Sequence, residues 1–185
     1  MSAPLSRALT VTSNVGLLPE IKNKVGICPG FNPKTLAPGT PHPPFHEFIG
    51  LWDTGATNSA ITDKVIAKCG LKPTGMVKVG TAAGEVDTET YLVNVALPNR
   101  VAFSNMTVTR GDLRGTDLLI GMDIINKGDL ALTNFNGKTV FSFRVPSQIT
   151  VDFVKESESA GKQGGFARPT GNPPADWWKG KKKRK

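Results

Sequence analysis

The 185-residue chain lacks any long hydrophobic run, and no stretch approaches the ~18 consecutive apolar residues of a membrane-spanning helix. Its first 24 residues carry one early arginine and no continuous apolar segment, so a secretory leader is not expected. Cysteine and histidine are scarce, with two of each, and Cys28 and Cys69 form no CxxC pair. Neither a disulfide scaffold nor a metal site is therefore expected. We expect a cytoplasmic protein without a cofactor.

The formal net charge of +8 is unevenly distributed along the chain. Residues 176–185 contain six Lys or Arg and one Asp, whereas residues 48–146 contain ten basic and nine acidic residues. A fold built to hold phosphate groups would be basic throughout, so no specific binding of nucleic acid is expected. The basic tail, residues 177–185, could bind an anionic partner weakly, or could be a solvated end that aids solubility.

Proline divides the chain into regions. Eight of the fourteen prolines fall in residues 1–47, and only two fall in residues 48–145. Because proline fixes φ and lacks a backbone N–H, the cluster at 38–44 cannot be a helix or a central strand. After Pro146 the sequence becomes polar and rich in glycine. The predicted parts are a Pro-rich extension that could include one strand (1–45), a domain (46–146), a polar linker (147–176) and the basic tail (177–185).

The middle of the chain has the pattern of short strands. Residues 48–52 form an apolar run that is too short for a helix. Residues 91–97 alternate between apolar and less apolar side chains, which predicts a strand with one buried face, and 101–108 predict the strand that returns from it. The spacing of these segments favours a small, mainly β, barrel-like domain.

One tight turn and two short helices complete the prediction. Asn136-Gly137 is the favoured pair for a type I′ hairpin turn, here between residues 129–135 and 138–145. A helix is predicted over 59–68, with Asn58 or Ser59 as its N-cap and Gly70 just beyond its end. A second short helix is expected to follow Asp123.

The motif that can carry chemistry is Asp53-Thr54-Gly55-Ala56, which directly follows the apolar run at 48–52. Asp, Thr and Gly are ordinary turn residues, so the motif alone is a weak signal. Two further features follow it in order. One is a tip of small residues at 80–84 between strand-like segments, and the other is an apolar strand at 117–120 that ends in Gly121. Together, over about residues 46–146, they resemble the retroviral-type aspartic proteases (retropepsins) and their bacterial single-domain relatives.

The resemblance implies a small closed β-barrel with one or two short helices, which is half of a two-fold symmetric aspartic protease. It implies that Asp53 is catalytic, that a Thr54 hydroxyl braces the two active-site loops, and that 141–145 contribute to an interface sheet. Trp52 is expected in the core and Asp123 in a structural role. The other implied site residues are Gly55 and Ala56 in the active-site loop, Gly80, Thr81, Ala82, Ala83 and Gly84 in a flap, and Ile120 and Gly121 behind the loop.

A pair of carboxylates explains why the motif needs a partner. Two such groups held close together cannot both be charged, so one can act as base toward a water while the other donates a proton. The chain has a single Asp-Thr-Gly, so the second aspartate must come from a second copy across a two-fold axis. The expected function is a homodimeric aspartic endopeptidase that cleaves peptide or protein substrates. The alternative is a non-catalytic dimerisation or peptide-binding module, which would not need an ionisable pair.

Overall fold

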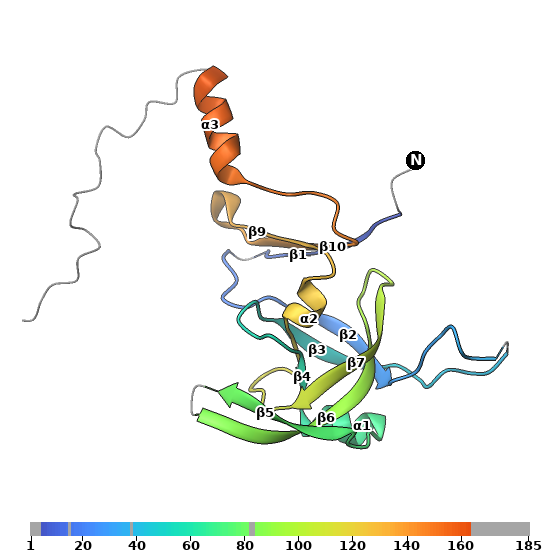
Figure 1. Ribbon diagram of the computed structural model, residues 1–185. Helices are drawn as coiled ribbons and strands as arrows, with labels where there is room; N and C mark the ends of the chain where they lie inside the picture. The colour runs from blue at the N-terminus through green and yellow to red at the C-terminus, as the bar shows by residue number, and fades with distance from the viewer. Residues whose placement is uncertain (1–4, 15, 38, 82–83, 164–185) are drawn as a thin grey trace, which may run out of the picture. The chain divides into compact units, whose positions relative to one another are not determined.

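The computed structural model describes residues 5–14, 16–37, 39–81 and 84–163, and the basic tail lies outside them (Figure 1). The chain forms two compact units, Met1–Gln148 and Ile149–Lys185. Among the described residues, the first unit contains two β-sheets and two short α-helices, and the second contains helix α3 (Phe153–Gln163). The predicted class, mainly β with few short helices, is confirmed.

The larger sheet has seven strands in the order β2-β3-β8-β4-β7-β6-β5. Strand β2 also pairs with β6, so the sheet curls back on itself around a core that includes Val93, Val108 and Ile120. Most neighbours are antiparallel, but β3 runs parallel to β8, and β4 runs parallel to β7. The strands are β2 (Lys22–Pro29), β3 (His46–Trp52), β4 (Ala60–Ile61), β5 (Gly75–Thr81), β6 (Gly84–Ala96), β7 (Ala102–Arg110) and β8 (Leu118–Ile120).

Strand β2 corrects the predicted boundary at residue 46. It lies between β3 and β6, and its Val25 and Ile27 side chains are buried in the core. Strand β1 (Arg7–Thr12) likewise belongs to the first unit. The residues expected to form an extension are therefore part of the same compact unit. Proline misled the prediction because Pro29 is the last residue of β2 and so ends the strand without interrupting it.

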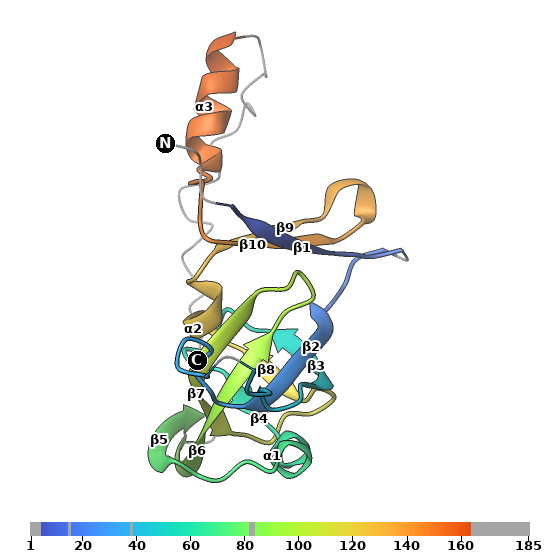
Figure 2. The same ribbon diagram turned by 90° about the vertical axis from the view of Figure 1, so that its right-hand side faces the viewer.

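The second sheet has three antiparallel strands in the order β1-β10-β9, where β9 is Asp129–Thr133 and β10 is Val140–Val145 (Figure 2). The central strand β10 buries Phe141 and Phe143, whose rings lie 4.9 and 4.8 Å from the ring of Trp52, centroid to centroid. These aromatic contacts join the second sheet to the end of β3, just before Asp53.

The β9–β10 hairpin is confirmed, but its turn is longer than predicted. Asn136 and Gly137 both have positive φ, 51° and 71°, as a type I′ pair requires. They lie, however, at the end of a 3₁₀ turn over Phe135–Gly137, and the nearest strand pair is Thr133 with Val140. The ladder stops there because Thr139 is buried and bonds to the Asn134 side chain at 2.7 Å.

Helix α1 (Asp63–Cys69) begins four residues later than predicted, although Gly70 ends it in the left-handed conformation as expected. The first predicted residues of this helix instead form β4, which pairs with both β7 and β8. Tertiary pairing therefore overrides the local helical pattern there. The second predicted helix is confirmed as α2 (Met122–Ile125), with Asp123 in its first turn.

In the second unit, α3 occupies part of the segment that was predicted to be a polar linker. Asp152 caps this helix, because its carboxylate accepts hydrogen bonds from the backbone N–H groups of Val154 and Lys155 at 3.1 and 3.2 Å. Composition indicated a linker, whereas the cap and the residues after it form a helix. Within the described ranges, no helix combines the length and apolar character that crossing a bilayer requires.

Candidate active site

The loop at residues 53–58, here called the Asp53 loop, starts where β3 ends. The backbone N–H of Asp53 donates to the Ile120 carbonyl at 3.0 Å, which continues the parallel pairing of β3 with β8. The Asp53 carboxylate accepts a hydrogen bond from the Gly55 N–H at 2.8 Å. Asp53 is half-buried, while Thr54 and Gly55 are exposed. The loop therefore presents its carboxylate and the following two residues at the surface of one copy of the chain.

Gly121 and the start of α2 hold the Asp53 loop from behind. The Met122 N–H donates to the Ala56 carbonyl at 2.8 Å, and the Asp123 N–H donates to the Thr57 carbonyl at 3.2 Å. A Cβ at position 121 would lie 2.7 Å from the carbonyl carbon of Asn58, and 3.0 Å from the Ala56 oxygen. Only glycine fits this close approach of two backbones.

Ser59 and Asp123 form a buried link between the same two segments. The fully buried Ser59 hydroxyl donates to Asp123 at 2.7 Å and accepts from the Gly121 N–H at 3.1 Å. The second Asp123 oxygen accepts from the Ser59 N–H at 3.1 Å. The contacts of Asp123 agree with the structural role expected for it. Ser59 was predicted only as a possible helix cap, and its spacing from Asp53 gave no signal of this bond to a residue 64 positions away.

Trp52 packs beside the site, as expected. Its side chain is buried, its ring contacts Phe141 and Phe143, and its indole N–H donates to Asn23 at 2.5 Å. The residue before Asp53 thus anchors the Asp53 loop to β2 and to the three-stranded sheet at once.

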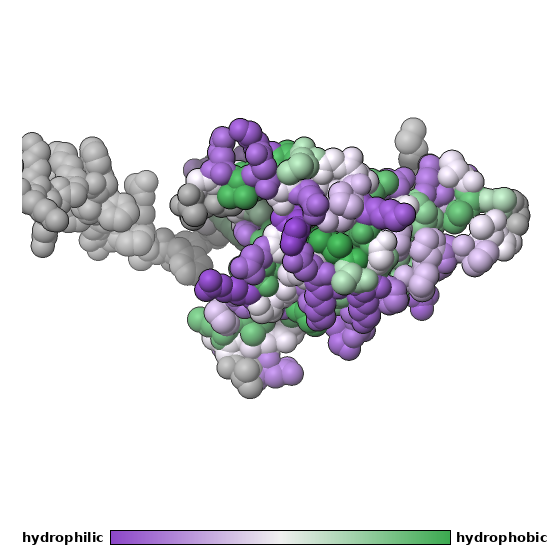
Figure 3. Space-filling view, turned by 90° about the horizontal axis from the view of Figure 1, so that it is seen from below, coloured by the Kyte–Doolittle hydropathy of each residue, from purple (hydrophilic) through white to green (hydrophobic). Residues whose placement is uncertain are grey.

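Residues 75–81 and 84–89 form an antiparallel hairpin of β5 and β6, here called the flap hairpin. Its last described pairs are Gly80 with Glu85 and Thr81 with Gly84, which has a φ of 119°. Of the predicted flap residues, Ala82 and Ala83 lie outside the described ranges. β5 is the edge of the seven-stranded sheet, and Met76 and Val86 are 71% and 52% exposed. Figure 3 shows the face that carries β5, β6 and α1, where hydrophobic residues lie among many hydrophilic ones.

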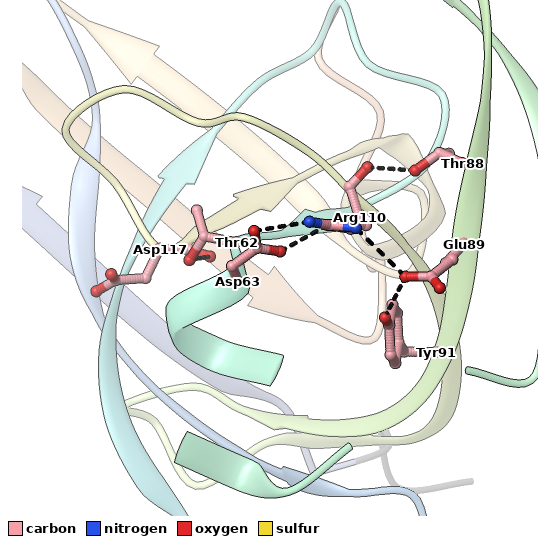
Figure 4. A network of polar contacts seen from close by, with 7 residues as sticks. All are labelled: Thr62, Asp63, Thr88, Glu89, Tyr91, Arg110 and Asp117. Atoms are coloured by element: carbon pink, nitrogen blue, oxygen red, sulfur yellow. Dashed lines mark hydrogen bonds and ion pairs between the residues drawn. The ribbon is translucent and has the colours of Figure 1, made fainter. Parts of the chain in front are cut away.

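A polar network lies at the base of the flap hairpin, centred on Arg110 (Figure 4). The guanidinium makes two hydrogen bonds to Asp63, at 2.6 and 2.8 Å, and lies 3.6 Å from Glu89. The Tyr91 hydroxyl donates to the same Glu89 carboxylate at 2.6 Å. Burial, with the adjacent carboxylate, raises the pKa of Tyr91 to about 12. No local pattern in the sequence predicts that these residues form a network, because they are scattered over three separate segments.

A family model described as "gag-polyprotein putative aspartyl protease" matches residues 46–127. The match runs from β3 through the Asp53 loop and the flap hairpin to the end of α2, and it confirms the predicted resemblance. The segment over residues 46–127 is therefore similar to this family of aspartyl proteases. No curated protein sequence matches the chain.

Two solved structures are similar to the chain. A retropepsin-like aspartic protease from Rickettsia conorii is 14% identical with a TM-score of 0.45, and the alignment covers 78% of this chain and 99% of that one. The EIAV protease in complex with the inhibitor HBY-793 is 19% identical with a TM-score of 0.42, covering 62% of this chain and 91% of that one.

Proposed function

We propose that the chain hydrolyses peptide bonds with a water activated by Asp53 and by the equivalent aspartate of a second copy. The observation that carries this proposal is the arrangement of the Asp53 loop. Its carboxylate is half-buried and bonded to the Gly55 N–H, and the loop backbone is fixed from behind by Gly121 and Asp123. A rigid loop that presents one carboxylate is suited to pair with its own copy.

The chemistry needs no covalent intermediate on the protein. In the pair, the ionised carboxylate takes a proton from water as the water oxygen adds to the substrate carbonyl, and the protonated carboxyl gives its proton to the carbonyl oxygen. The tetrahedral species then breaks its C–N bond, and the leaving amine receives a proton from the pair. The Thr54 hydroxyl is assigned to bracing the two loops, and the flap hairpin to covering the bound peptide.

Residues 141–145, expected to contribute to an interface sheet, lie in β10, which is central in its sheet and pairs with β1 on one side and β9 on the other. A new strand cannot pair with β10 unless one of these neighbours leaves. Within this sheet the outer edges of β1 and β9 remain for pairing, so we assign the contact between copies to them. A cytoplasmic location and weak anion binding by the basic tail belong to the same proposal.

The experiment that tests this function is cleavage of a complex peptide mixture across about pH 4–8, the range over which carboxylate pairs can be tuned. We expect cleavage by the wild type and none by Asp53→Asn. The matched control is Asp112→Asn, which changes another aspartate in an exposed position and should retain activity. Equal cleavage by wild type and Asp53→Asn would overturn the proposal. A dimeric wild type that cleaves nothing would favour the non-catalytic peptide-binding module.

A subunit-mixing experiment tests whether the pair spans two copies. Excess Asp53→Asn protein is equilibrated with a fixed amount of wild type before activity is measured. If each active site needs one Asp53 from each copy, mixed dimers are inactive, so activity should fall as the variant captures wild-type chains. Unchanged activity in a mixture shown to exchange subunits would overturn the shared site.

A further inference from the structure

We propose that Arg110 is a positioning residue that holds the base of the flap hairpin to the segment leading out of the Asp53 loop. It thereby sets how readily the hairpin opens. This inference rests on the proposed function, because it assigns the hairpin the task of covering substrate.

The Arg110 side chain bridges two elements. Its Nε and Nη2 atoms donate to the two carboxylate oxygens of Asp63, at 2.6 and 2.8 Å, and Asp63 is the first residue of α1, just after β4. Its Nη1 atom lies 3.6 Å from Glu89 on the flap hairpin. A planar guanidinium can serve two carboxylates at once, whereas a lysine ammonium cannot reproduce the paired bonds.

The Arg110 backbone also bridges two elements, β4 and the flap hairpin. Arg110 is paired with Ile61 of β4, the strand that follows directly on Ser59, and the next N–H, of Gly111, donates to the Ile61 carbonyl at 2.9 Å. On the opposite side, the Thr88 hydroxyl donates to the Arg110 carbonyl at 2.8 Å. The side chain of this one residue therefore joins α1 to the flap hairpin, and its backbone joins β4 to the same hairpin.

The Arg110 contacts lie where the flap hairpin joins the rest of the sheet. Strand β6 pairs with β7 from Thr90 onward, opposite Thr109, whereas the preceding residues of β6 pair with β5. Glu89 and Thr88 are thus the last residues of the flap hairpin before it joins the rest of the sheet. Residues 84–87 beyond them are exposed. Contacts at such a junction determine the free energy of a local opening, because few packing contacts act further out.

Hydrogen exchange of the flap hairpin amides is the direct test, made on the full chain without substrate. We compare wild type with Arg110→Gln, and with Asp63→Asn, which removes the partner charge and keeps the side-chain shape. Both should speed exchange at residues 76–80 and 85–88 by about two- to fivefold, the change expected from losing one ion pair. The matched control is Lys24→Gln, which breaks another exposed ion pair, 2.8 Å from Glu47, between β2 and β3. It should leave flap exchange unchanged.

Peptide cleavage by the same variants supplies the second readout. Easier opening should raise KM by about two- to fivefold, with a smaller change in kcat, because the chemical groups are untouched. Unchanged flap exchange in Arg110→Gln would overturn the inference. Equal acceleration at β2 and β3 would do the same, since it would indicate general destabilisation. Hydrogen exchange needs no substrate, so it can be measured even if the wild type cleaves nothing. Faster exchange of the flap hairpin in Arg110→Gln would then support the role of Arg110 and reject the proposed protease.

Discussion

The Asp53 loop and the flap hairpin are held in opposite ways. The Asp53 loop is bound from behind by Gly121 and by the buried Ser59–Asp123 pair, so that a displacement of its backbone would break several hydrogen bonds. The flap hairpin pairs mainly with itself, exposes Met76 and Val86, and is tied down only near Arg110 among the contacts described above. In the proposed function the Asp53 carboxylate needs fixed geometry and the flap hairpin needs to move, and the contacts of the two regions differ accordingly.

The largest effect is expected from adding a methyl group at Gly121, on the Asp53-loop side of this comparison. Gly121→Ala would place a Cβ 2.7 Å from the backbone of Asn58, and the two segments would have to separate. We expect a loss of about 2–3 kcal/mol in the free energy of unfolding, typical of overpacking, and loss of activity. The measurement is urea denaturation followed by the peptide assay.

Gly80→Ala is the matched change in the flap hairpin, where a Cβ would meet nothing within 4 Å. It should leave the free energy of unfolding within about 0.5 kcal/mol of wild type. If both glycine variants lost stability equally, the contrast between a packed loop and an open hairpin would be wrong.

A smaller effect is expected from removing one hydroxyl group. Ser59→Ala leaves the buried Gly121 N–H without its acceptor and removes one donor to Asp123. The cost should be about 1–3 kcal/mol in the free energy of unfolding, the penalty for a buried polar group without a partner. Thr74→Ala removes an exposed hydroxyl at the start of the flap hairpin and should cost less than about 0.5 kcal/mol. Thermal melts of the two variants measure whether Ser59→Ala loses more stability than Thr74→Ala.

Thiol labelling perturbs the protein least, and it compares the accessibility of buried and exposed cysteine side chains. Cys28 and Cys69 are buried, and burial raises the pKa of Cys28 to about 11 and also raises that of Cys69. A thiol introduced by Val86→Cys, in the exposed hairpin, should react roughly 100-fold faster at pH 8 than either native thiol. Native thiols that react as fast as the introduced one would contradict the packed state of β2 and α1.

The raised thiol pKa values also predict a direction for stability against pH. The folded chain keeps Cys28 protonated, whereas the unfolded chain ionises it above its ordinary pKa of about 8.5. Its contribution to stability is therefore fully present below that pH and is lost as the pH rises through about 11. Urea midpoints measured from pH 8 to 11 should fall more for wild type than for Cys28→Ala.

The sequence predicted those parts of the fold that depend on local patterns. Tyr91, Val93 and Val95 lie at alternate positions along β6 and are all buried. Gly70 ends α1 in the left-handed conformation, which favours glycine. The Asp53 motif and the sequence around Gly121 could be found because glycine and aspartate mark turns. The positions of the candidate site residues in the chain could therefore be proposed from the sequence.

The parts that could not be predicted depend on contacts distant in sequence. Ser59 was predicted to lie in a helix, yet its neighbours Ala60 and Ile61 pair with β7 and β8. The Arg110 network joins α1, β6 and β7, and no single segment contains a recognisable part of it. Prolines near β2 suggested an extension, although pairing with both β3 and β6 makes that strand part of the core. In each case the deciding partner lies on another strand.

The pairing of Arg7 with Val145 has a mechanical consequence. The chain enters β1 and leaves β10 at the same end of one antiparallel pair, so tension applied between these two residues would peel the strands apart. The hydrogen bonds between the strands would then break one after another, because the force acts on one bond at a time. In a shear geometry, by contrast, all the bonds would share the force. The three-stranded sheet would therefore yield at low force, releasing β1 while the Asp53 loop and the seven-stranded sheet kept their internal pairing.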